Sequence, residues 1–123
     1  MQDSIQAAYL GFAKTAAQYV AQNFASWHAG SRFPAFWGPN FDWIPDQDHG
    51  GNLLMALQTM LLQADDGTIL VLPAWPKQWD VDFKLHAPRH TTVECEYRDG
   101  KILELKVTPA ERRKDVIVTE PAK

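Results

Sequence analysis

The stretch GNLLMALQTMLLQADDGTILVL, residues 51–72, contains the change of period that decides the fold. Its first part carries apolar residues at spacings of three and four, which is the pattern of an amphipathic helix. We expect this helix to run from about Gly50 to Gln63 and to end before the turn-forming residues 65–67. From residue 68 to 72 the sequence Thr-Ile-Leu-Val-Leu is typical of a strand. The chain therefore changes from helix to strand within this stretch.

A second helix is predicted upstream, from Asp3 to about Phe24, with Asp3 or Ser4 as its cap. Its apolar residues also recur at spacings of three and four: Ile5, Tyr9, Phe12, Ala16, Tyr19, Val20 and Phe24.

Strand-like segments follow residue 72, at about 82–85, 91–97, 102–107 and 115–118. A two-residue turn at Asp99-Gly100 would pair Cys95 with Glu104 and mix charged with apolar residues on the inner face. We therefore expect a three-residue loop over 98–100, with Gly100 left-handed and Cys95 opposite Leu103. The residues expected to be buried in the sheet are Leu70, Leu72, Val93, Cys95, Leu103 and Leu105.

These segments predict the α+β class. Two antiparallel helices, joined by a long aromatic loop, would precede a small antiparallel sheet, with a helical segment over residues 1–64 and a β-region over 65–123. A chain of 123 residues with 46% hydrophobic content can form one compact unit with a core of its own.

Composition argues against two classes of partner. A net charge of −3 and a pI near 5.7 give no basic surface for nucleic acid, and Arg112, Arg113 and Lys114 are interpreted as a solvated turn. No apolar run approaches the roughly 20 residues of a membrane helix. The first ten residues lack the basic segment of a signal peptide. We expect a soluble chain, secreted or periplasmic only as part of a larger exported enzyme.

The segment between the helices, residues 26–48, has neither a helical nor a strand period. It is rich in aromatic residues, which a solvated linker would not be: Trp27, Phe33, Phe36, Trp37, Phe41 and Trp43. Two interpretations remain open. The rings fill the core beneath an irregular loop, or they form the wall of a pocket in which they stack on sugar rings while carboxylates bind the hydroxyls.

No metal site and no cofactor is expected. Asp46 and Asp48 resemble the start of a calcium loop, but the twelfth position is Leu57 instead of a bidentate Glu. His86 and His90 lie far from the other histidines and are expected at the surface.

Asp48 has two compatible interpretations. It could cap the following helix, because its side-chain oxygen could accept an amide hydrogen bond from Gly50 or Gly51. The positive end of the helix dipole would also keep it ionised, as a water-activating base requires.

Three segments together carry a family resemblance: DHGGNLLMALQTMLLQ at 48–63, DGTILVLPAWPKQW at 66–79 and EYRDGKI at 96–102. Their order and spacing resemble the C-terminal portion of inverting glycoside hydrolases of the family 95 α-L-fucosidase type. That family has a DGNFGG motif at a late helix ending in MLLQ, then an LLPALPKAW-like segment and a hairpin with DGK. His49 and Gly50 depart from the motif, so the resemblance does not fix the sugar.

The resemblance implies an (α/α)6 barrel followed by a β-domain, of which this chain would be the end. Asp48 would help activate the attacking water, while the general acid would lie upstream, so the isolated chain is expected to be inactive. Residues expected to line the carbohydrate site are Trp37, Phe41, Asp42, Trp43, Asp46 and His49. The exposed helix faces would bind the rest of the parent domain or a second copy. The alternative is a non-catalytic structural or carbohydrate-binding α+β domain that self-associates.

Overall fold

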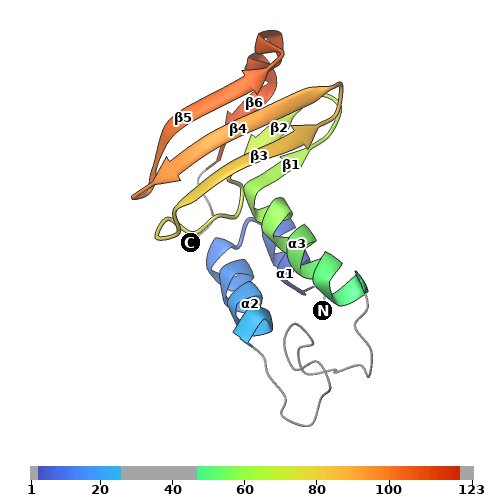
Figure 1. Ribbon diagram of the computed structural model, residues 1–123, viewed down its shortest axis with the longest axis vertical. Coiled ribbons are helices and arrows are strands. Elements are labelled where there is room, and N and C mark those ends of the chain that lie inside the picture. The colour runs from blue at the N-terminus through green and yellow to red at the C-terminus, as the bar shows by residue number, and fades with distance from the viewer. Residues whose placement is uncertain (1–2, 26–46, 120–123) are drawn as a thin grey trace.

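The computed structural model describes residues 3–25 and 47–119. Three helices are followed by two three-stranded sheets, so the predicted α+β class is confirmed. Figure 1 shows α1, α2 and α3 gathered at one end of the molecule and the strands at the other. Within the described part of the chain, no helix is long and apolar enough to cross a membrane.

The prediction of one helix from Asp3 to Phe24 is wrong, because the chain forms two: α1 (Asp3–Tyr9) and α2 (Ala13–Ala25). Gly11 separates them with a left-handed φ of 76°. The amide of Gly11 donates to the Ala8 carbonyl at 3.0 Å, and the amide of Phe12 donates to the Ala7 carbonyl at 2.9 Å. This pair of bonds is the Schellman motif, which ends a helix and lets the next one start in a new direction.

The packing face of α1 and α2 consists mainly of small side chains. Its buried members are Ser4, Ala7, Ala8, Ala13, Ala16, Ala17 and Val20. Three aromatic residues of the expected stripe, Tyr9, Phe12 and Tyr19, are instead exposed. Small residues allow close approach of backbones, and α1 contacts both α2 and α3.

Helix α3 (Gln47–Leu61) begins about three residues earlier than predicted and leads directly into a short strand, β1 (Leu62–Ala64), that was not predicted. Leu53, Met60 and Leu61 are buried, whereas Leu54 is exposed. The side chain of Gln63 in β1 fixes this junction, because its Nε2 donates to the carbonyls of Ala8 at 2.9 Å and Thr59 at 3.1 Å.

The first sheet has the order β1-β2-β6, with β2 (Ile69–Val71) antiparallel to β1 and parallel to β6 (Val116–Val118). The second sheet is antiparallel, with β3 (Val81–Ala87), β4 (Thr91–Arg98) and β5 (Lys101–Thr108) in sequence order. The expectation of one wholly antiparallel sheet is therefore wrong. A 3-10 helix, η1 (Ala110–Asp115), connects β5 to β6.

The two sheets and the helices share one hydrophobic core. Its members include Met60 of α3, Ile69 and Val71 of β2, Val93 of β4 and Val116 of β6. In the view of Figure 1 the β3-β4-β5 sheet lies in front of the β1-β2-β6 sheet.

The register predicted for the β4–β5 hairpin is wrong. Arg98 pairs with Lys101 across a two-residue turn in which Asp99 and Gly100 both have positive φ, the geometry of a type I′ turn. Tyr97 pairs with Ile102, but Glu96 pairs with Glu104, so a bulge on β5 shifts the register by one residue and places Cys95 opposite Leu105. Leu103 is the extra residue of the bulge and is 62% exposed rather than buried.

Of the other residues expected inside, Leu72, Val93 and Cys95 are buried, whereas Leu70 and Leu105 are half-buried. The segment after β2 is also packed inside: residues 72–76 are all buried, and the Trp75 indole donates to the Trp79 carbonyl at 2.8 Å. The two indole rings meet edge to face, with centroids 5.5 Å apart.

Candidate functional site

Of the residues predicted to form the site, the structure describes the backbone of Asp48 and His49, which belong to α3. Because α3 starts at Gln47, Asp48 and His49 lie inside its first turn, and Asp48 is not the N-cap residue that the sequence suggested. The role of Asp48 as a water-activating carboxylate stays a prediction.

The other predicted site residues lie outside the described residues: Trp37, Phe41, Asp42, Trp43 and Asp46. How they are arranged around Asp48 and His49 therefore stays a prediction.

The surface of α3 beside this turn is open at Gly51. This glycine is exposed, and no described heavy atom lies within 4 Å of the position that a Cβ would take. A substrate or a neighbouring helix could therefore approach the backbone closely at this point.

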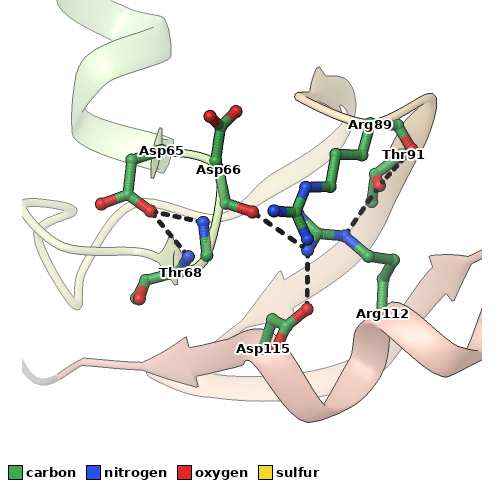
Figure 2. A network of polar contacts seen from close by, with 8 residues as sticks. Asp65, Asp66, Thr68, Arg89, Thr91, Arg112 and Asp115 are labelled. Atoms are coloured by element: carbon green, nitrogen blue, oxygen red, sulfur yellow. Dashed lines mark hydrogen bonds and ion pairs between the residues drawn. The ribbon is translucent and has the colours of Figure 1, made fainter.

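A buried polar network centres on Arg112, which was expected in a solvated turn and is instead only 6% exposed. Figure 2 shows its guanidinium between three segments of the chain. Its Nε donates to Thr91 Oγ1 at 3.1 Å, and its Nη1 donates to Asp115 Oδ2 at 2.6 Å and to the Asp66 carbonyl at 3.3 Å. The expectation holds for Arg113 and Lys114, which are exposed.

The role of Arg112 is structural in this geometry. It joins the turn before β2, the start of β4 and the end of η1 through one side chain. Its Nη2 is buried without a partner among the described residues. The sequence signal that could have singled it out is Asp115, three residues later, which a helical turn would bring to the same side.

The outer face of the β3-β4-β5 sheet carries ordered rows of charge. One row consists of the paired residues Asp82, Glu96 and Glu104. Arg98 offsets part of this negative charge, because its Nη2 lies 2.8 Å from Asp82 Oδ2, and this hydrogen bond raises the pKa of Arg98 above its ordinary value.

The next row alternates in sign, with Glu94 between Lys84 and Lys106. Alternating charges across neighbouring strands attract one another and keep the face polar. Over residues 3–25 and 47–119, no group of three or more His, Cys, Asp or Glu side chains is arranged to hold a metal ion.

His86 and His90 are exposed, as expected, and His86 Nδ1 lies 3.3 Å from Thr92 Oγ1. Cys95 is buried, which confirms its prediction as an interior thiol, and burial raises its pKa to about 11. Such a thiol is a poor nucleophile at neutral pH.

Comparison with known proteins gives no match: no family model, no curated protein and no solved structure matches this chain. The family resemblance of its motifs stays a prediction.

Proposed function

We propose that the chain is the C-terminal part of an inverting glycoside hydrolase, in which Asp48 helps to activate the attacking water. The proposal starts from the resemblance of segments 48–63, 66–79 and 96–102 to the family 95 type. The order of elements agrees with it, since helices come first and a β-region follows.

The observation that carries the proposal is the set of large apolar side chains that the helices leave exposed. Leu10 is 66% exposed and Phe12 46%, both in the turn between α1 and α2, and Leu54 of α3 is 61% exposed. Burying one such side chain contributes about 1.5 to 3 kcal/mol, so exposed side chains of this kind favour a further helical partner. The remaining helices of an (α/α)6 barrel would supply that partner.

In this proposal Asp48 acts as a base toward water and not as a proton donor. Its place in the first turn of α3 favours the ionised carboxylate. Inverting hydrolysis also needs a separate acid about 6.5 to 9.5 Å away, which the upstream part of the parent enzyme would contribute. The 123-residue chain by itself should then have no glycosidase activity.

Turnover of aryl glycosides tests this proposal. The protein encoded by the complete reading frame is assayed on a panel of fucosides, galactosides and glucosides, with Asp48→Asn as the test variant. Asn keeps the size of the side chain and removes the negative charge, so we expect a loss of at least about 100-fold in kcat. Asp3→Asn is the matched control, because Asp3 also lies in the first turn of a helix and is exposed.

If the complete protein is active and Asp48→Asn leaves its turnover unchanged, the catalytic role of Asp48 is ruled out. Activity of the 123-residue chain alone would rule out an acid contributed from upstream.

A second candidate is a non-catalytic α+β domain that associates with itself through the same exposed side chains. Exposed Phe12 and Leu54 favour it as well. Sedimentation of the 123-residue chain with Phe12→Ser and Leu54→Ser separates the two candidates. Dimers that these changes dissociate, together with inactivity of the complete protein, would favour the self-associating domain.

A further inference from the structure

A cleft of about 440 Å³ lies where the helices meet the strands, away from the first turn of α3. Helices α1 and α3 contribute Tyr9, Met55 and Gln58 to its lining, while β1 and the turn after it contribute Gln63 and Asp65. His86 of β3 also lines it. The cleft combines apolar and polar walls.

The apolar wall includes two large exposed side chains. Tyr9 is 64% exposed and Met55 50% exposed, and they come from two different helices. A tyrosine ring and a thioether in the lining of one cleft offer polarisable surface to the apolar face of a small ring.

The polar wall is rich in hydrogen-bond acceptors. Both amide hydrogens of Gln63 have protein partners, since Nε2 donates to the carbonyls of Ala8 and Thr59, so its Oε1 is left as an acceptor. Asp65 Oδ1 accepts the amides of Gly67 at 2.8 Å and Thr68 at 2.7 Å. Figure 2 shows the second oxygen of Asp65 directed away from these two bonds.

The charge of Asp65 is stabilised by its turn. Its hydrogen bonds from Gly67 and then Thr68 hold the pKa of the carboxyl below its ordinary value. At neutral pH the residues lining the cleft therefore include an ionised carboxylate and a side-chain amide. Ligands with several hydroxyl donors match such a wall.

We propose that this cleft binds a neutral saccharide, with its apolar face on Tyr9 and its hydroxyls directed to Gln63 and Asp65. The choice of a saccharide rests on the proposed function, because a second carbohydrate site would hold the substrate chain near the enzyme. The site itself is defined by the cleft and its lining.

Titration of the ¹⁵N-labelled 123-residue chain tests the proposal, with L-fucose, D-galactose and D-glucose each added alone. We expect progressive amide shifts at Tyr9, Gln58, Asp65 and His86 for at least one sugar. Tyr9→Ala should weaken binding about ten-fold through loss of the stacking surface, whereas Tyr9→Phe should retain it. Asp65→Asn keeps an acceptor for the turn and should weaken binding on the order of three-fold.

Tyr19→Ala is the matched control, because Tyr19 is an exposed tyrosine of α2 that lies outside the residues lining the cleft. Its binding should equal that of the unchanged chain. Shifts that survive Tyr9→Ala, or the absence of shifts with all three sugars, would overturn the proposal.

Two further ligands test the chemistry. If choline changes the amide chemical shifts of these residues and the sugars do not, the cleft binds cations and the proposal is overturned. If glycerol changes them as much as the sugars do, the cleft does not recognise a ring. Failure in these titrations is distinguishable from failure of the proposed function, which is measured as turnover through Asp48.

Discussion

Replacement of Arg112 by Met should strongly destabilise the protein. Met keeps much of the length and apolar stem of the side chain but removes the charge and every donor. Arg112 makes three hydrogen bonds, to Thr91, Asp66 and Asp115, and only 6% of its surface is exposed.

The magnitude follows from these contacts. Each hydrogen bond from a charged donor stabilises the fold by about 1.5 kcal/mol at the low end of the usual range. Removing the one buried donor that lacks a partner relieves a desolvation penalty of about 1 kcal/mol. The free energy of unfolding should therefore fall by about 3 to 4 kcal/mol. The unpartnered donor is Nη2. Arg112→Lys should lose about half as much, because an ammonium cannot reach three partners in the guanidinium geometry.

Urea unfolding, followed by circular dichroism and tryptophan fluorescence, measures the free energy of unfolding. Arg113→Met is the control, since Arg113 is adjacent and exposed, and its change should stay within about 0.5 kcal/mol. A loss from Arg112→Met below about 1 kcal/mol, or equal to that of Arg113→Met, would refute the assigned network. A double-mutant cycle with Asp115→Asn should give a coupling of about 0.5 to 3 kcal/mol.

Three other predictions concern single positions. Gly51→Ala should stabilise the chain by about 0.5 to 1 kcal/mol, because this glycine is helical and has no described atom near its Cβ position. Gly100→Ala should destabilise the chain by about 1 kcal/mol, because Gly100 has a φ of 76°. Urea midpoints that move in the same direction for both variants would contradict this. Leu103→Ala should change the free energy of unfolding by no more than about 0.5 kcal/mol, and a larger loss would mean that the bulge is misplaced. Cys95 should resist iodoacetamide in the folded chain. Its pKa is raised from 9.0 to about 11, so between these pH values the unfolded thiol loses its proton while the folded one keeps it, and the free energy of unfolding should fall as pH rises from 9.0 toward 11. A Cys95→Ala chain should lose that part of the pH dependence.

The sequence predicts the elements of the β-region better than their pairing. The segments at 91–97 and 102–107 correspond to β4 and β5, because alternation identifies strands locally. Alternation also implied that a two-residue turn would place Glu104 inside opposite Cys95. The protein keeps that turn and inserts Leu103 as a bulge, which restores the apolar phase and is not visible in a pattern of period two.

Contacts between distant segments were beyond local patterns. The parallel pairing of β2 with β6 joins Ile69 to Val116, and no periodicity specifies that these two strands run in the same direction. The burial of Arg112 has the same origin, since its partners Thr91 and Asp66 lie 21 and 46 residues away. Of the candidate site, the sequence located Asp48 near a helix start to within about one turn.

The break at Gly11 decides which side chains of the first two helices face outward. A continuous helix would have directed Tyr9, Phe12 and Tyr19 along one stripe, whereas the Schellman motif turns α2 so that alanines pack inside. Burying an aromatic or leucine side chain contributes about 1.5 to 3 kcal/mol, far more than an alanine methyl at about 0.8 kcal/mol, so a helix pair that packed alone should bury its large residues. Leaving Phe12 and Tyr19 outside is favourable when another part of the protein packs on them, whereas Tyr9 lines the cleft. Such side chains therefore favour a further packing partner, which the proposed barrel and the self-associating domain would each supply.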